Sequence, residues 1–271
     1  MNYCVNYRPH IPAYDTIDEI IIDFEKCNTS SFIEFVENHL NQRLIISVSN
    51  YVNFIDNKEY KVLQAIHEKY IDLDIVIMFS RYDEEYLKKF KEETTLSYFY
   101  STRASNWDTF LGLAAIGVSD IYVIEELCFE LDKVAEIAHS RNIKIRTYAN
   151  VCQTSWKETD SLLTFFIRPE DVDFYSQYID TIEFFGEKEQ IPIFYKIYAE
   201  DKKWFGPLNE IIIGFNSDLD NKYVIPLFAE KRVSCGKKCV KGGKCKICHR
   251  IEELSKVLEQ SGLVVMVDKN E

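Results

Sequence analysis

The sequence predicts an α/β protein whose parallel sheet closes into a barrel, and three observations lead to this prediction. First, short runs rich in β-branched and aromatic residues recur along the chain and alternate with helical patterns. Second, eight such strand candidates are present, which is the number that an α/β barrel requires. Third, the chain has 271 residues, so one barrel of about 250 residues fits its length.

The predicted strands follow one another at similar spacing, and each of the first five is followed by a helical pattern. The strands are predicted at residues 19–24, 44–49, 74–79, 96–101, 120–125, 143–149, 162–167 and 180–185. The helices are predicted at residues 31–40, 59–70, 83–93, 106–117 and 130–142. In the last of these helices, Val134, Ile137 and Ala138 share one face, which is typical of a helix packed on a sheet.

Alternation of strands and helices favours parallel pairing through right-handed crossovers. A barrel leaves no sheet edge exposed. An open, doubly wound sheet is the alternative, but no predicted strand is followed by a G-x-G-x-x-G turn. We therefore predict a (β/α)8 TIM-like barrel over residues 1–186. Residues 187–271 are predicted to form a C-terminal helical, Cys-rich appendage packed on that barrel.

The sequence predicts a cytoplasmic protein that does not enter a membrane. No run approaches the ~20 apolar residues that cross a bilayer. The first residues, "MNYCVNYRPHIP", have neither a basic leader nor an apolar signal core. In the cytosol, clustered cysteines are more often metal ligands or redox groups than disulfides.

Candidate catalytic residues lie just after the predicted strands, where a barrel builds its functional face. This ring mixes carboxylates, amides and arginines, so it predicts a small polar or anionic substrate. We single out Arg103, Glu125, Asn150 and Arg168 as the residues that shape the site. Other members of the ring include Tyr148 and Glu183. The sequence has no Walker loop, no G-x-S-x-G elbow and no H-E-x-x-H motif, which disfavours the enzyme classes that use them.

Four cysteines are concentrated in the segment "SCGKKCVKGGKCKICHR" at residues 234–250. Their spacing is C-x3-C-x5-C-x2-C, and its C-x2-C pair is a usual metal-binding knuckle. Four thiolates suit either Zn²⁺ or a [4Fe–4S] cluster, and the spacing does not decide between them. Reduced or disulfide-linked thiols are the remaining alternative. The predicted metal ligands are Cys235, Cys239, Cys245 and Cys248.

The basic charge of the chain is concentrated around these cysteines. Residues 231–250 hold eight Lys or Arg and no acid, whereas the whole chain has a formal charge of −12. The acidic remainder disfavours general binding to a phosphate backbone. The lysines are first interpreted as offsetting the negative charge of a metal–thiolate centre, and RNA contact through the basic 231–250 tail is the second interpretation.

One segment resembles a known family. Residues 117–153 hold Gly117, Asp120 and Tyr122, then "AH" at residues 138–139, and then a strand followed by Asn150. This pattern is similar to the core of the collagenase-like peptidase family of the U class. The resemblance implies a TIM-like barrel with a cysteine cluster. It also implies functions such as RNA-base or ubiquinone hydroxylation, in some members with an iron–sulfur cluster.

Two functions are therefore expected for this chain. The first is a metal-binding barrel enzyme, with an iron–sulfur or zinc centre, that carries out redox, hydroxylation, RNA-modification or peptidase chemistry. The second is a barrel without catalytic activity, used for binding or assembly, in which a structural zinc holds the appendage in place.

Overall fold

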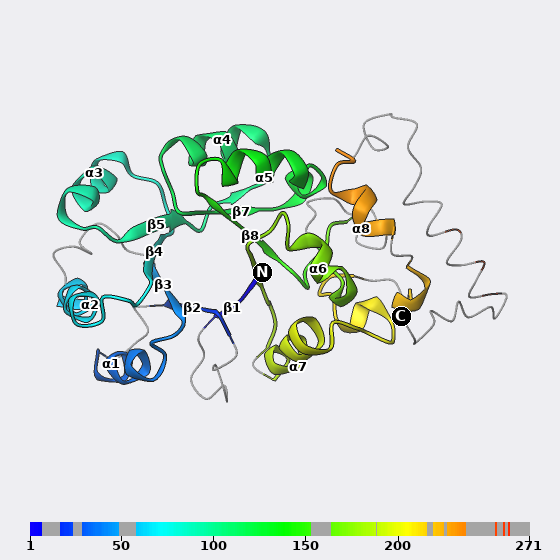
Figure 1. The fold of residues 1–271 in the computed structure, drawn as a ribbon, viewed down its shortest axis with the longest axis horizontal. Helices are drawn as coiled ribbons and strands as arrows, with labels where there is room; N and C mark the ends of the chain where they lie inside the picture. The colour runs from blue at the N-terminus through cyan, green and yellow to red at the C-terminus, as the bar shows by residue number, and fades with distance from the viewer. Residues whose placement is uncertain are drawn as a thin grey trace.

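The computed structural model describes residues 1–6, 17–23, 29–48, 58–152, 164–187, 189–215, 219–224 and 227–236, together with the single residues 253, 257 and 260. Figure 1 shows the arrangement of the helices and strands. Of the four predicted metal ligands, Cys235 is described. Cys239, Cys245 and Cys248 lie outside the described residues.

The described strands form one parallel, nearly closed sheet. Its order is β5-β4-β3-β2-β1-β9-β8-β7-β6. The two ends of this order approach each other, because Ser119 N at the start of β7 donates to Tyr98 O on β5 at 2.9 Å. The strands are β1 (Asn2–Asn6), β2 (Glu19–Asp23), β3 (Arg43–Val48), β4 (Ile75–Phe79), β5 (Ser97–Tyr100), β6 (Arg103–Ala104), β7 (Asp120–Val123), β8 (Lys144–Tyr148) and β9 (Thr181–Glu183).

Helices surround this sheet, as Figure 1 shows for α1 to α5. They are α1 (Thr29–Asn38), α2 (Lys58–Lys69), α3 (Glu84–Glu93), α4 (Trp107–Ala115), α5 (Leu131–His139), α6 (Val172–Tyr175), α7 (Ile191–Tyr195) and α8 (Leu227–Arg232). Shorter turns of helix are η3 (Glu125–Phe129), η4 (Pro169–Asp171), η5 (Lys196–Asp201), η6 (Leu208–Glu210) and η7 (Asn221–Tyr223). The prediction of an α/β barrel-like fold is confirmed, and the arrangement is consistent with a TIM-like barrel.

Local sequence explains where several helices begin. The Asp83 side chain accepts a hydrogen bond from Tyr86 N at 2.9 Å and so caps α3. Asn106 caps α4 in the same way, through Thr109 N at 3.0 Å. Helix α5 turns Val134 and Ala138 into the core, as its periodicity predicts.

The described part of one predicted strand forms no strand, and a strand that was not predicted takes part in the sheet. Residues 164–167, the described part of predicted strand 162–167, add no strand to the sheet. Phe165 and Phe166 are instead buried against other rings, Phe165 against Tyr175 of α6 and Phe166 against Phe228 of α8. Their apolar character therefore reflects burial beneath helices. The strand that pairs with both β9 and β2 is β1, at the start of the chain.

Four charged side chains fill the amino-terminal end of the sheet's interior. These are Glu19 on β2, Arg43 on β3, Asp120 on β7 and Arg146 on β8, and all four are buried. Arg43 donates to both carboxylate oxygens of Asp120, at 2.7 and 2.8 Å. Arg146 pairs with Glu19 and, at 3.2 Å, with Asp120. Two positive and two negative charges offset one another, which makes their burial tolerable.

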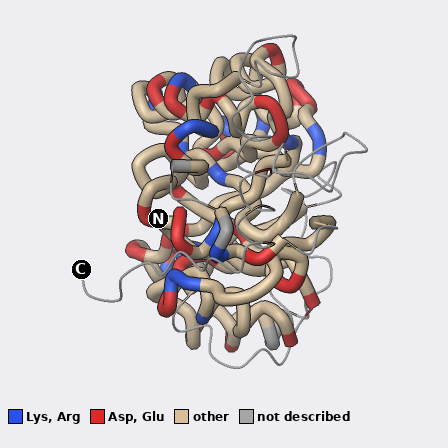
Figure 2. Tube along the Cα trace, turned by 90° about the vertical axis from the view of Figure 1, so that its right-hand side faces the viewer, with Lys and Arg blue, Asp and Glu red and all other residues tan. Residues whose placement is uncertain are grey.

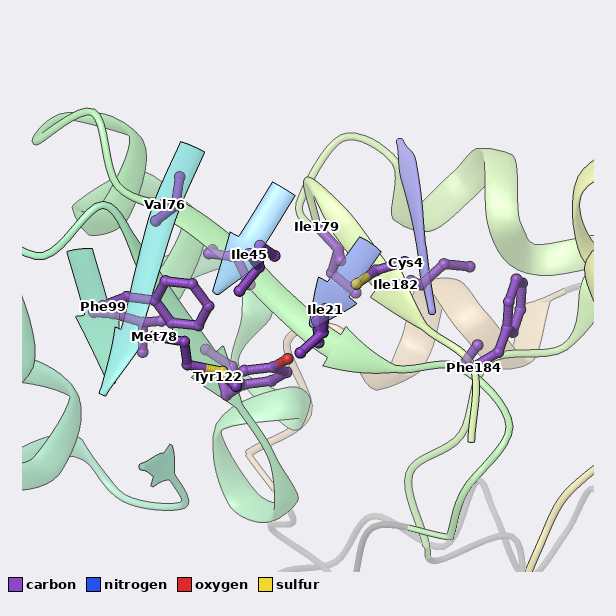
Figure 3. Packing of buried hydrophobic residues seen from close by; sticks show 14 of the residues in the cluster. Cys4, Ile21, Ile45, Val76, Met78, Phe99, Tyr122, Ile179, Ile182 and Phe184 are labelled. Carbon is purple, nitrogen blue, oxygen red and sulfur yellow. The ribbon is translucent and has the colours of Figure 1, made fainter. Parts of the chain in front are cut away.

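An apolar layer follows this charged cluster along the strands. Ile21, Ile45 and Val76 are neighbours in register on β2, β3 and β4. Ile21 and Ile45 lie two residues beyond Glu19 and Arg43, so they point to the same side of the sheet. Figure 3 shows this packing together with Phe99 and Tyr122, whose ring centroids are 6.0 Å apart. The interior is therefore a packed core that separates the charged cluster from the carboxyl ends of the strands.

The chain after β9 packs back onto the strands. Tyr198 in η5 donates from its hydroxyl to Ile167 O at 2.9 Å, and Tyr3 of β1 donates to Tyr198 O at 3.4 Å. Residue 213 forms a bridge with Val151 just after β8. The division of the chain at residue 186 stays a prediction.

Candidate functional site

The carboxyl ends of four neighbouring strands bring a stack of planar side chains together. Arg103 on β6 is in register with Tyr122 on β7. The rings of Tyr122 and Tyr148, which is on β8, are stacked with centroids 5.7 Å apart and planes 20° apart. The guanidinium carbon of Arg103 lies 4.9 Å from the centroid of Tyr148. The stack therefore runs from a buried tyrosine to an exposed arginine.

Glu183 on β9 fixes the buried end of this stack. Its carboxyl group accepts hydrogen bonds from Tyr122 Oη at 2.5 Å and from Asn6 Nδ2 at 2.8 Å. Burial raises the pKa of Glu183, although the Tyr122 hydrogen bond and the charge of Arg146 act in the opposite direction. Burial, followed by the charge of Glu183, also raises the pKa of Tyr148 to about 12. The phenols are thus held in their neutral, hydrogen-donating form.

Replacing Glu183 with glutamine is expected to increase the free energy of unfolding at pH 8. A carboxyl group whose folded pKa is raised contributes stability below its unfolded pKa, here 4.5, and loses that contribution as pH rises through the folded pKa. The side-chain oxygen of glutamine can still accept from Tyr122. Its NH2 group can donate to the Asn6 side-chain oxygen once the Asn6 amide has flipped. Urea unfolding from pH 4 to pH 8 measures the difference. A variant less stable than wild type at pH 8 would contradict the prediction.

A cavity of about 250 Å³ opens beside the exposed end of the stack. It lies at the carboxyl ends of β6, β7, β8 and β9, the edge where parallel barrels place their sites. Two of the predicted site residues, Arg103 and Glu125, lie together in its wall. The described residues that line it are Arg103, Ile124, Glu125, Tyr148, Val151, Cys152 and Phe185.

Glu125 holds an unusual backbone conformation at the edge of this cavity. Its φ is 53°, in the left-handed region that residues other than glycine seldom adopt. The conformation lies at the junction of β7 and η3, where the chain turns sharply after the strand. Strained backbone of this kind concentrates at functional sites because the surrounding structure must maintain it. Glu125 therefore combines an unusual backbone conformation with a place in the cavity wall, and its functional role stays a prediction.

Asn150 lies behind the cavity wall. It is fully buried, and its side chain forms two hydrogen bonds with the backbone of Phe185: it donates to Phe185 O at 2.7 Å and accepts from Phe185 N at 2.9 Å. The backbone carbonyl oxygen of Asn150 also accepts a hydrogen bond from Ile213 N at 2.8 Å. These bonds position Phe185, which does line the cavity. The direct catalytic role predicted for Asn150 stays a prediction.

Arg168 is also buried and has a full set of local partners. Its guanidinium donates to both oxygens of Asp171, at 2.7 and 2.8 Å, and to Val224 O at 2.7 Å. These contacts join η4 to the segment after η7. Arg168 is not among the described residues that line the cavity. Its catalytic role therefore stays a prediction. Its hydrogen bonds give it a structural role, because they connect η4 to Val224.

The cysteine segment begins beside the same β7–η3 connection. Gly236 N donates to Phe129 O, at the end of η3, at 2.9 Å, and Cys235 is half-buried against the core. Within the described part of the chain, no three His, Cys, Asp or Glu side chains are grouped to hold a metal ion. Cys235 has the soft thiol donor that zinc or an iron–sulfur cluster requires. The other three predicted donors lie outside the described residues.

Arg232 anchors this segment from within. It is fully buried among aromatic rings, with its guanidinium carbon 4.4 to 5.1 Å from four ring centroids. Cation–π attraction offsets part of the cost of burying the charge. The rings belong to Phe129, Phe165, Phe166 and Phe228. Arg232 is therefore not available on the surface as part of the basic 231–250 tail, whereas the neighbouring Lys231 is exposed.

Charged residues of both signs are interspersed along the described chain, as Figure 2 shows. Among the described residues, no helix has the length and apolar character needed to cross a membrane. Searches against protein-family models and against curated proteins find no match to this chain.

Sequence reasoning did not select three residues of this site. Asn6 belongs to the strand that was not predicted, and Tyr122 lies one residue before the end of its strand, so neither follows a predicted strand end. Phe185 is 52% exposed despite being a large apolar residue. The run "EFFG" after β9, with an aromatic residue next to a glycine, was the signal available in the sequence.

Proposed function

We propose that this protein is a barrel enzyme that binds a small polar or anionic molecule in the cavity at the carboxyl ends of β6 to β9. The single observation that carries this proposal is the meeting of Arg103, Glu125 and Tyr148 in the wall of one cavity. The carboxyl-end location supports a functional role, since parallel barrels build their sites at that edge.

Arg103 is the anion-binding group in this proposal. Among the residues that the structure describes, its guanidinium pairs with no carboxylate, and its neighbour is the ring of Tyr148. A guanidinium held close to a ring still has N–H groups to donate, and these match a carboxylate or phosphate in two hydrogen bonds. Arg103 is preorganised by a chain of contacts. Glu183 bonds to Tyr122, Tyr122 stacks on Tyr148, and Tyr148 contacts Arg103.

A metal centre formed by Cys235, Cys239, Cys245 and Cys248 is the second part of the proposal. When bound, an iron–sulfur cluster would supply electron transfer for redox or hydroxylation chemistry, as in the collagenase-like family that residues 117–153 resemble. The contact between Gly236 and Phe129 supports a position near the cavity, because η3 joins Glu125 to Phe129. Anaerobic metal and sulfide analysis distinguishes a coloured iron–sulfur protein from a colourless zinc protein.

Substitution of Arg103 with glutamine tests the anion site. Isothermal titration calorimetry with benzoate, acetate and inorganic phosphate is expected to detect binding of at least one of these to the wild-type protein. The R103Q variant is expected to bind that anion roughly tenfold or more weakly, because a charge-assisted hydrogen-bond pair is lost. R81Q, at an exposed arginine after β4, is the matched control and should bind as wild type does. Equal binding by R103Q, or no binding by wild type, would overturn the anion site.

A binding or assembly barrel with a structural zinc is the alternative function. The burial of Arg232 and the hydrogen bond of Gly236 favour it, since both fix the start of the cysteine segment to the barrel. We also propose that β5 and β6 act as one interrupted strand, so that the barrel counts as a (β/α)8 unit. We further propose that the protein is cytoplasmic. RNA contact through residues 231–250 would rest on the lysines, because Arg232 is buried.

A further inference from the structure

The geometry points to a zwitterionic ligand for the cavity: an α-amino acid with an apolar side chain, bound between Arg103 and Glu125. This inference rests on the proposed function and narrows it from small polar or anionic molecules to one chemical class. Three features of the cavity support it, namely one charge of each sign in the same wall, the backbone conformation of Glu125, and the apolar side chains of the lining.

The two charges lie in the wall of the same cavity without pairing with each other. Arg103 and Glu125 both line it, and among the described residues Arg103 has no carboxylate partner. Among the described residues of the lining, these two are the ones that carry a charge. A ligand with a carboxylate and an ammonium group could contact both side chains at once, whereas a simple anion would bring its negative charge near that of Glu125.

Backbone geometry fixes the end of the cavity that would bind the ammonium group. The left-handed conformation of Glu125 sets the direction in which its side chain leaves the chain, just after β7. Each carboxylate oxygen accepts more than one hydrogen bond, so Glu125 can receive an ammonium donor alongside its existing contacts. The position of Arg103 is set by a different contact, the one between its guanidinium and the ring of Tyr148.

The rest of the lining selects for size and an apolar side chain. Ile124, Val151 and Phe185 supply apolar surface, and Phe185 is 52% exposed. Water released from this surface favours an apolar ligand side chain. The volume of about 250 Å³ is below the range of sites for drug-sized ligands, so it suits a single amino acid.

Calorimetry with three matched probes tests the inference. L-phenylalanine carries both charges, 3-phenylpropionate lacks the ammonium group, and phenethylamine lacks the carboxylate. L-phenylalanine is expected to bind at least tenfold more tightly than either of the others, because each missing charge removes one charge-assisted contact between the ligand and the protein. In E125Q this advantage over 3-phenylpropionate is expected to disappear, while E126Q, at the next residue, keeps it.

The outcomes separate this inference from the function on which it rests. If 3-phenylpropionate binds wild type as tightly as L-phenylalanine, and through Arg103, the zwitterion inference is wrong and the anion site stands. An advantage that persists in E125Q also overturns it. If no probe binds, and benzoate, acetate and phosphate do not bind either, the proposed function fails as well.

Discussion

Replacing Arg146 with methionine is expected to lower the free energy of unfolding by about 3–5 kcal/mol. Arg146 is fully buried and pairs with both Glu19 and Asp120. Methionine has a similar length and no charge, so the substitution would leave two buried carboxylates with Arg43 as their remaining buried partner. Uncompensated buried charge is far more costly than the loss of a surface ion pair.

Urea unfolding at pH 7 measures this effect, and two further variants control for it. R141M, at an exposed arginine of the α5–β8 connection, is expected to change stability by less than about 0.5 kcal/mol. The double variant R146M/E19Q is expected to recover part of the loss because it removes one of the uncompensated charges. An R146M protein as stable as R141M would refute the assignment of this cluster as a structural element.

The pH dependence of the wild-type protein should follow the same cluster. Burial alone would raise the pKa of Asp120, but hydrogen bonding to Arg43 and the charges of Arg146 and Arg43 outweigh it and hold the pKa at about 2. The pKa of Glu19 is lowered by the same two arginines against the effect of burial. Groups with depressed folded pKa contribute stability above their unfolded pKa, which is 3.8 for Asp120. The protein should therefore lose stability as pH falls from about 4 to 2, and R146M should lose less over that interval.

The double substitution C235S/C245S is expected to abolish metal binding and to lower the free energy of unfolding by several kcal/mol. Metal bound by four thiolates stabilises the folded state directly, because the unfolded chain has no preformed site. The structural effect should be concentrated at residues 227–236, where α8 and Gly236 attach the segment to the barrel.

Metal analysis and thermal unfolding measure the two effects on the same samples. C152S is the matched control, because Cys152 is a partly exposed thiol outside the cysteine segment. It is expected to retain full metal content. A C235S/C245S protein that retains its metal would show that the ion is bound elsewhere. A variant that loses the metal and keeps its stability would exclude the structural zinc.

The sequence predicts those parts of the fold that depend on local pattern. Runs such as "EIIID" and "DIYV" become strands because β-branched and aromatic residues suit a buried sheet. The run at residues 162–167 has the same composition, yet its described part is buried beneath helices, since propensity does not distinguish a buried strand from another buried segment. The strand "NYCVN" was missed because asparagine at both ends weakens the pattern, although both asparagines donate to buried carboxylates, Asn2 to Glu19 and Asn6 to Glu183.

The sequence predicted where the candidate site lies, but it predicted only some of the residues that form it. Arg103 and Glu125 follow predicted strands and do meet in one cavity, since parallel strands end at one edge. Arg168 follows a segment that is not a strand in its described part, and it is not among the described residues that line the cavity, so its role stays a prediction. The stack from Glu183 to Arg103 could not be inferred, because contacts between residues distant in sequence leave no local signal.

The central position of β1 between β9 and β2 has a consequence for how the chain folds. Asn6 meets Glu183 across 177 residues, and Arg146 meets Glu19 across 127. Such long sequence separations give a high contact order, which slows folding because a large loop must close before the contacts form. During synthesis, the first strand leaves the ribosome long before β9 exists to pair with it. We therefore expect the pairing of β1 with β9, and with it the contact between Asn6 and Glu183, to form late in folding.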